Sequence, residues 1–227
     1  MRGGLELRVD GTLASFQRPG AALTGPVWWA LAAPVLLLPS RRPRRVLLLG
    51  LAAGSVARAL RALDGAAELV GVDYDADVVA AAREHFGLGD LRVDVVVDDA
   101  LAFLRRERRR FDMVVEDLFV GPSRSVRKPD WLLGEGYRLV ARRLAPGGVF
   151  TSNTIHEMPA VARAARVFGS RVVSLDVAGH WNRIVVAGER VPPPRALRRA
   201  FAEDSRLGPM LERVAVRARG AAAQRRT

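Results

Sequence analysis

Short apolar runs alternate with longer amphipathic stretches through the middle of the chain. The runs predict strands, and the amphipathic stretches predict helices between them. The predicted strands are residues 46–49, 68–72, 93–97, 111–116 and 149–153, and the predicted helices are residues 55–63, 76–86, 100–106, 131–144 and 159–168. Because the early strands are apolar on both faces, helices should cover both sides of a parallel sheet.

The two ends of this pattern predict antiparallel pairs. Residues 172–176 and 183–187 predict two strands joined by a turn too short for a crossover helix. Near the start, residues 5–9 alternate around Asp10-Gly11, which predicts a β-hairpin with residues 12–16. Residues 21–38 predict one helix or two short ones. The predicted fold class is α/β, a doubly wound Rossmann-like methyltransferase sheet that is mostly parallel, with an antiparallel terminal strand and a small N-terminal hairpin.

The composition changes after Ala187 and suggests three units. Residues 1–40 hold the hairpin and a lead-in segment, and residues 41–190 hold the Rossmann-like domain. Residues 191–227 begin with a stiff Pro-rich linker and continue as an Arg-rich segment with a helical pattern. We expect this tail to form a surface helix pair with a frayed end, which could also provide a homodimer contact.

A small-residue turn follows the first predicted strand of the parallel series. Gly50 and Gly54 frame this turn, a helix follows it, and Asp73 ends the next strand at close to the ~20-residue spacing of nucleotide-binding βαβ units. Glycine lets the backbone approach a ligand, the free N–H groups of the helix face it, and the acid can accept both ribose hydroxyls. The alternatives are that the glycines only pack the helix on the sheet, and that Asp73 caps the helix after it.

Composition excludes several classes of protein. The 227 residues include no cysteine and three separated histidines, so we predict no disulfide and no metal site. The net charge of +12 comes almost entirely from arginine, and Lys128 is the only lysine. We interpret residues 105–110 as a solvated helix end, with RNA or an acidic partner as the alternative. Residues 21–40 carry no charge, but prolines interrupt them, so we expect no membrane span and a cytoplasmic protein.

Seven motifs, in order, resemble the spermidine synthase-like branch of the class I S-adenosylmethionine-dependent transferases. They are Asp10-Gly11-Thr12-Leu13-Ala14-Ser15, Thr24-Gly25-Pro26-Val27-Trp28, Leu47-Leu48-Leu49-Gly50-Leu51-Ala52-Ala53-Gly54-Ser55, Val72-Asp73, Asp98-Asp99-Ala100, Val114-Val115-Glu116-Asp117 and Leu144-Ala145-Pro146-Gly147-Gly148-Val149. The resemblance covers roughly residues 5–188.

The resemblance implies S-adenosylmethionine or its decarboxylated form as cofactor and assigns the site residues. The cofactor-binding candidates are Gly50, Ala52, Gly54, Asp73, Tyr74, Asp99 and Ala100. Asp117 is the candidate proton acceptor and Glu116 its rival, since strand alternation sends their side chains to opposite faces. Gln17 and Asn153 are candidates for the substrate pocket. Asp99 could instead serve only as the cap of the helix after it.

Two departures from the family pattern bear on the substrate. Ala53 stands where aminopropyltransferases carry an aspartate in the glycine loop, and no second acid follows Asp117 before Pro122. A diamine is dicationic at neutral pH and requires carboxylates at both ends. The sequence therefore favours methyl transfer to an unidentified small molecule. The alternatives are aminopropyl transfer and a non-catalytic relative that binds an adenosyl ligand or RNA. A nicotinamide-dependent oxidoreductase is disfavoured by the terminal strand pair and the missing third glycine.

Overall fold

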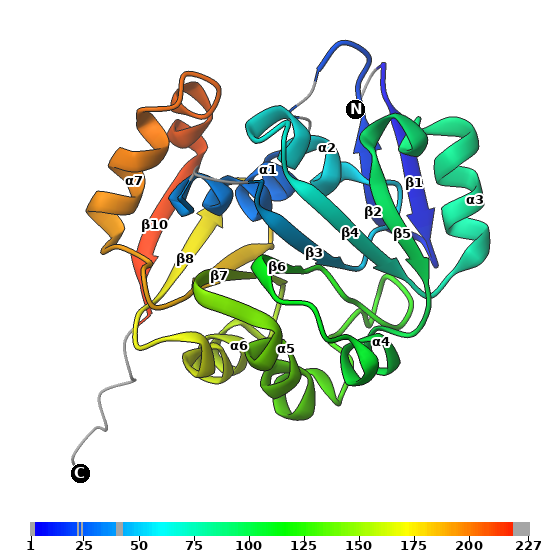
Figure 1. The fold of residues 1–227 in the computed structure, drawn as a ribbon. Coiled ribbons are helices and arrows are strands. Elements are labelled where there is room, and N and C mark those ends of the chain that lie inside the picture. Colours follow the sequence, from blue (N-terminus) through cyan, green and yellow to red (C-terminus); the bar gives the residue numbers. More distant parts are fainter. Residues whose placement is uncertain (1–2, 22, 24, 40–42, 220–227) are drawn as a thin grey trace.

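The computed structural model describes residues 3–21, 23, 25–39 and 43–219. Its centre is a twisted eight-stranded sheet with the strand order β10-β8-β9-β7-β6-β3-β4-β5 (Figure 1). Five of these strands are parallel: β3 (Arg45–Leu49), β4 (Glu68–Asp73), β5 (Val93–Val97), β6 (Phe111–Glu116) and β7 (Leu144–Thr154). The antiparallel strands are β8 (Val172–Val177), β9 (Arg183–Ala187) and β10 (Val214–Ala218). The predicted fold class is confirmed.

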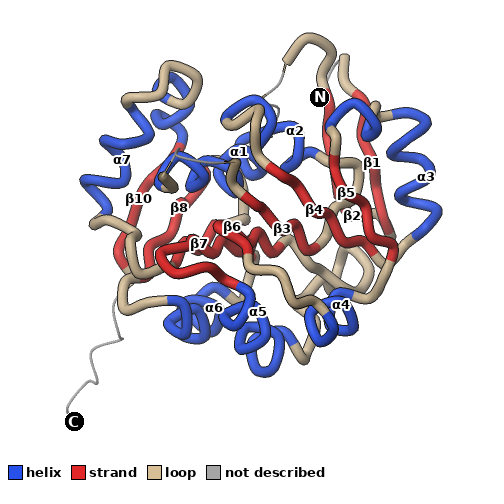
Figure 2. The backbone as a smooth tube through the Cα atoms, viewed as in Figure 1, coloured by secondary structure: helices blue, strands red, loops and turns tan. Residues whose placement is uncertain are grey.

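Helices cover both faces of the sheet, as Figure 2 shows in blue against the red strands. One face carries α1 (Pro26–Ala32), η1 (Ala33–Leu37), α2 (Ser55–Leu63), α3 (Ala76–His85), η2 (Leu88–Leu91), α7 (Pro194–Ala202) and η5 (Gly208–Arg213). The other carries α4 (Ala100–Arg106), η3 (Leu132–Gly136), α5 (Tyr137–Arg143), α6 (Met158–Ala164) and η4 (Ala165–Phe168). Along β3, Val46 and Leu48 pack on the first face, and Leu47 and Leu49 on the second. This period of two explains why the strand is apolar throughout.

The segment between β6 and β7 is helical over residues 132–143, close to the prediction of 131–144, but its first turn is not α-helical. It forms a single π-helical turn, η3, followed by α5, which ends at Arg143. The next strand, β7, begins at Leu144 and is irregular against β6 where the Pro-Gly-Gly sequence lies. Gly147 has a φ of +75° there, which favours glycine. Pro146 and the glycines therefore lie inside a bulged strand entry rather than in a helix-ending loop.

The C-terminal tail is not the surface helix pair that its pattern suggested. Within residues 191–219, α7 is the only α-helix, and β10 joins the main sheet as an antiparallel neighbour of β8. Leu197, Phe201, Leu207 and Leu211 are buried in the core. The tail to residue 219 is thus part of the folded domain.

The N-terminal hairpin, β1 (Leu5–Val9) and β2 (Thr12–Gln17), forms a separate two-stranded sheet. It is held against the start of α2, because the Ser55 hydroxyl accepts from Phe16 N at 3.0 Å and donates to Phe16 O at 3.2 Å. The apolar stretch that follows the hairpin is broken into α1 and η1, both buried. Within the described residues, no helix is both long and apolar enough to cross a bilayer.

Acidic partners engage much of the arginine-rich run at residues 105–110. Arg105 pairs with Glu135 at 2.9 Å, and Arg109 pairs with Glu107 at 2.7 Å. Arg106 pairs with Asp98. These local ion pairs account for part of the positive charge that could otherwise have indicated nucleic-acid binding.

Candidate active site

A cavity of about 550 Å³ lies at the carboxyl ends of the parallel strands. It straddles β3, so one half faces β4 and β5 and the other faces β6 and β7, the crevice where open α/β sheets bind ligands. Eight of the predicted site residues line it: Gly50, Ala52, Asp73, Tyr74, Asp99, Ala100, Asp117 and Asn153. Gly54, Glu116 and Gln17 are not among its lining residues.

The glycine loop is pressed tightly against the end of β6. A Cβ at Gly50, whose φ is +85°, would lie 2.7 Å from the carbonyl oxygen of Asp117. In addition, Asp117 N donates to Leu49 O at 2.9 Å. Only glycine is compatible with this approach, which places the loop directly beside the candidate catalytic acid. Ala52 also has a positive φ, +46°, so the loop adopts a glycine-like turn without glycine at that position.

Asp73 accepts hydrogen bonds from the backbone of the glycine loop. Its Oδ2 accepts from Leu51 N at 3.1 Å and from Ala52 N at 2.7 Å, and its Oδ1 accepts from Asp75 N at 3.1 Å. A carboxylate has about four lone-pair sites, so one remains for a ribose hydroxyl. Asp73 therefore shapes the loop and can still accept one ligand hydrogen bond there. It does not cap α3; Asp75 does, accepting from Asp77 N and Val78 N.

The loop amides are used within the protein instead of facing the cavity freely. Beyond the two that bond Asp73, the amide of Ala53 donates to the Ser15 hydroxyl at 3.0 Å. These three loop amides are therefore not directed at a ligand; they precede α2, whose N–H groups were the ones expected to face it. A loop without free donors is poorly suited to a pyrophosphate. It suits a cationic, phosphate-free adenosyl sulfonium, so the residues present match that cofactor.

Asp99 lies where it can act both as a cap and as a ligand contact. Its Oδ1 accepts from Ala102 N at 2.9 Å and caps α4. Its other oxygen has no hydrogen-bond partner within the described ranges, and the residue lines the cavity. Asp98 is engaged differently, because it accepts from Asp99 N at 2.9 Å and pairs with Arg106.

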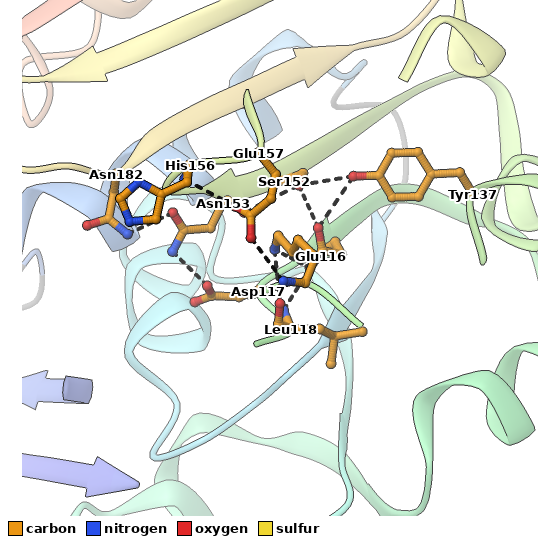
Figure 3. Close-up of polar contacts among 10 residues, drawn as sticks. Glu116, Asp117, Leu118, Tyr137, Ser152, Asn153, His156, Glu157 and Asn182 are labelled. Carbon is orange, nitrogen blue, oxygen red and sulfur yellow. Dashed lines mark hydrogen bonds and ion pairs between the residues drawn. The ribbon is translucent and has the colours of Figure 1, made fainter. Parts of the chain in front are cut away.

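Asp117 is oriented by a chain of two amides (Figure 3). Asn153 Nδ2 donates to Asp117 Oδ1 at 2.8 Å, and Asn182 Nδ2 donates to Asn153 Oδ1 at 3.0 Å. Burial raises the pKa of Asp117 to about 6, although the Asn153 hydrogen bond and the Lys128 charge oppose the shift, and Glu116 adds to it. A carboxylate with this pKa is mostly deprotonated at neutral pH and is a stronger base than an exposed aspartate.

Glu116 points into the protein, away from the cavity. Its Oε1 accepts from Lys128 Nζ at 2.6 Å and from Leu118 N at 2.7 Å, and its Oε2 accepts from the Ser152 hydroxyl at 2.5 Å (Figure 3). Tyr137 Oη lies 3.5 Å from Oε2, and burial followed by the Glu116 charge raises the pKa of Tyr137 well above its ordinary value. Glu116 is thus placed in a buried polar network rather than beside a ligand.

Two other predicted residues lie in structural positions. Gln17 Oε1 accepts from Arg58 at 3.4 Å, on the helix side of the hairpin. Gly54, with a φ of +79°, is the N-cap of α2, and a Cβ there would lie 3.0 Å from Leu88 Cδ1. Packing of η2 against the helix start explains this glycine.

Sequence reasoning missed several residues of the site. Ser15 holds the loop, and Asn182, His180 and Arg213 line the cavity. Lys128 neutralises Glu116, and its being the only lysine in an arginine-rich chain was a signal that could have singled it out. No comparable signal marked the other four, because their place depends on segments that are distant in sequence.

Comparison with known proteins shows the family of the chain. Residues 31–178 match the spermine/spermidine synthase domain. The polyamine aminopropyltransferase of Aeropyrum pernix is 32% identical over 72% of this chain and 57% of its own length. That of a Synechococcus strain is 37% identical over 48% of this chain and 36% of its own length. The chain thus spans 57% of the length of the first relative and 36% of the length of the second.

A solved structure extends the likeness to the fold of nearly the whole chain. A probable spermidine synthase from Corynebacterium glutamicum superposes with a TM-score of 0.73 over 95% of this chain and 83% of that one, at 18% identity. The spermine/spermidine synthase domain match covers most of the chain. The glycine loop, Asp73 and Asp117 lie around one cavity within the fold. The chain belongs to the spermine/spermidine synthase family.

Proposed function

We propose that the protein transfers an aminopropyl group from decarboxylated S-adenosylmethionine to an amine. The observation that carries the proposal is the position of Asp117. This carboxylate, with its pKa raised to about 6, lines the cavity beside the glycine loop and between the two halves of the sheet. The names of the curated relatives favour aminopropyl transfer over the methyl transfer that the sequence favoured.

The half of the cavity over β4 and β5 is suited to the adenosyl group. Asp73 keeps one lone pair for a ribose hydroxyl, and Asp99 keeps one oxygen for the amino group of adenine. Tyr74 is largely exposed at the rim and can cover the adenosine. When bound, the sulfonium supplies an already activated carbon, so the protein has to position the reactants and remove a proton.

Asp117 is the group placed to accept that proton. An amine acceptor is protonated in neutral solution and can attack only after losing one proton. Asn153 fixes the Asp117 carboxylate, because its amide donates to Asp117 and accepts from Asn182, and only one orientation of the amide satisfies both. Acid–base assistance of this kind contributes about 10²–10⁴-fold to a rate.

The proposal is tested by supplying both cofactors to the purified protein. With decarboxylated S-adenosylmethionine and a panel of mono- and diamines, we expect release of 5′-methylthioadenosine, detected by chromatography. With S-adenosylmethionine and the same amines, we expect little S-adenosylhomocysteine. Asp117→Asn should lower the first activity without loss of cofactor binding. Formation of S-adenosylhomocysteine alone would show that the protein is a methyltransferase.

A further inference from the structure

The acidic residues of the cavity are distributed unevenly between its two halves. Asp73, Asp75, Asp98 and Asp99 follow β4 and β5, and Asp10 belongs with them, because its charge and those of Asp73 and Asp75 raise the pKa of Tyr74 after burial. In the half over β6, β7 and β9, Asp117 is the sole carboxylate that lines the cavity among the described residues. One carboxylate can neutralise one ammonium group.

The wall beyond Asp117 carries amide and basic side chains. Asn153 ends β7, His180 and Asn182 belong to the turn between β8 and β9, and Arg213 ends η5. The backbone holds these segments together, since Ala178 N donates to Arg213 O at 2.8 Å. His180 and Arg213 both line the cavity, and burial followed by the Arg213 charge lowers the pKa of His180.

Among the described residues, no acidic side chain pairs with Arg213. Its side chain has no ion pair or hydrogen bond to any residue in the described ranges, although it borders both the cavity and a shallow cleft beside it. The two acids of that cleft do not replace a cavity carboxylate. Asp176 is paired with Arg217 at 3.1 Å and with Arg219 at 2.9 Å, and Glu212 borders only the cleft. The guanidinium is therefore available to a ligand that reaches past Asn182.

From this arrangement we propose that the acceptor is an amine with a carboxylate or similar anion at its other end. Its amino group lies at Asp117 and its anionic group at Arg213. A diamine would bring its second ammonium to a wall where Arg213 repels it and where, among the described residues, no lining carboxylate pairs with it. The inference rests on the proposed aminopropyl transfer and names the class of its substrate.

The reaction balances with the groups present. The ammonium of the acceptor gives one proton to Asp117, and the free amine attacks the aminopropyl carbon next to sulfur. The C–N bond forms as the C–S bond breaks, and the sulfur keeps the electron pair to leave as neutral 5′-methylthioadenosine. The product is a secondary ammonium that retains the distal carboxylate, and Asp117 releases its proton to solvent.

Two acceptors of equal chain length separate the alternatives. Putrescine and 4-aminobutanoate each have four carbons and differ at the distal end, which is an ammonium on the fourth carbon in one and a carboxylate formed by the fourth carbon in the other. 4-Amino-1-butanol supplies a neutral control. With decarboxylated S-adenosylmethionine, we expect kcat/KM to be at least about tenfold higher for 4-aminobutanoate than for putrescine, since a charged hydrogen bond is worth that much. The product mass identifies which acceptor received the aminopropyl group.

Variants at Arg213 test the assignment of the distal group. Arg213→Ala should reduce the preference for 4-aminobutanoate, and Arg213→Glu should reverse it in favour of putrescine. Arg195→Glu makes the same change of charge at an exposed position on α7 and should leave the preference unchanged. Equal preferences in Arg213→Glu and the wild type would overturn the role of Arg213.

Binding measurements keep the two proposals distinguishable. If no acceptor releases 5′-methylthioadenosine, the proposed function fails. Titration calorimetry with 5′-methylthioadenosine present still compares the acceptors, and tighter or equal binding of putrescine would then overturn the acceptor class. Turnover with putrescine as the better substrate would overturn the acceptor class and leave aminopropyl transfer standing.

Discussion

Lys128 Nζ lies 2.6 Å from Glu116 Oε1, with both side chains sequestered from solvent. The same ammonium donates to Leu118 O at 3.0 Å and lies 4.0 Å from the centre of the Phe119 ring. The pair therefore fixes the chain on both sides of Asp117, the residue between Glu116 and Leu118. It stabilises the end of β6 and the segment that leaves it over the cavity.

Removing the Lys128 charge should destabilise the protein strongly. Lys128→Met leaves Glu116 buried without a counter-charge, and we expect the free energy of unfolding to fall by about 3–5 kcal/mol. Urea unfolding followed by circular dichroism measures the change. The double variant Lys128→Met with Glu116→Gln should recover part of it. Arg105→Met breaks the exposed pair with Glu135 and should have little effect. A Lys128 variant as stable as the Arg105 variant would contradict the prediction.

The rate should depend on the protonation of Asp117. The proton acceptor is the deprotonated carboxylate, and its pKa is raised to about 6. The contribution of Asp117 to kcat/KM should therefore rise with pH through about 6 and then level off. Steady-state assays between pH 5 and pH 8 check the midpoint. In Asp117→Asn, turnover should be low and this rise should disappear. A rise that persists in the variant would assign the base to another group.

The same raised pKa gives a stability prediction of opposite sign. An acid whose folded pKa exceeds its unfolded value stabilises the fold at low pH and loses that contribution as pH rises through the folded pKa. Asp117→Asn should therefore be more stable than the wild type at pH 8, and this advantage should shrink towards pH 4. Thermal unfolding at the two pH values measures the difference. An advantage of equal size at both would contradict the shift.

The amide chain behind Asp117 should tune its pKa. The hydrogen bond from Asn153 favours the charged carboxylate and lowers its pKa. Asn153→Ala should therefore move the midpoint of the pH–rate profile upward. Asn182→Ala removes only the partner that orients Asn153, so we expect a smaller shift in the same direction. A lower rate with an unmoved midpoint in both variants would show a purely structural role.

Asp73 should matter to the loop as well as to the ligand. Asp73→Ala removes the acceptor for three backbone amides and a charged hydrogen bond to ribose, so affinity for 5′-methylthioadenosine should fall about tenfold to a hundredfold. Calorimetry measures the affinity, and urea unfolding should show a parallel loss of stability. Asp77→Ala, on the exposed side of α3, is a control for removing a nearby charge. Unchanged affinity in Asp73→Ala would refute the assignment.

The buried tail should be essential for stability. Phe201 is fully buried on α7, so Phe201→Ala should reduce the free energy of unfolding by about 3–5 kcal/mol. Arg199→Ala, on the exposed side of the same helix, should change it by less than about 0.5 kcal/mol. Chemical denaturation of the two variants compares them. Equal stabilities of the two variants would contradict the burial of α7 and support the surface position that the sequence suggested.

The sequence alone determined most of the parallel core. Apolar runs and amphipathic stretches placed β3 to β6 and α2 to α4 within about one residue, because each element is set by contacts of neighbouring side chains with one buried face. The same local logic placed Asp73 and Asp117 at strand ends, and parallel strands bring such ends to one edge of the sheet. Gly50 was evident for the same reason, since a tight turn after a strand is a local requirement.

Only the tertiary structure decided the tail and the acceptor half of the site. β10 is a strand because it pairs with β8. Strand preference depends on such pairing and packing more than on the residues of a short segment taken alone. Asp73 bonds a loop some twenty residues earlier in the sequence, and Lys128 reaches Glu116 across a connecting loop. Asn153 and Asn182 bond because β7 and β9 are neighbours in the sheet, and Arg213 lines the same cavity because the end of η5 bonds the turn after β8. Local pattern cannot encode such proximity, since it arises from how the finished sheet and its covering segments pack.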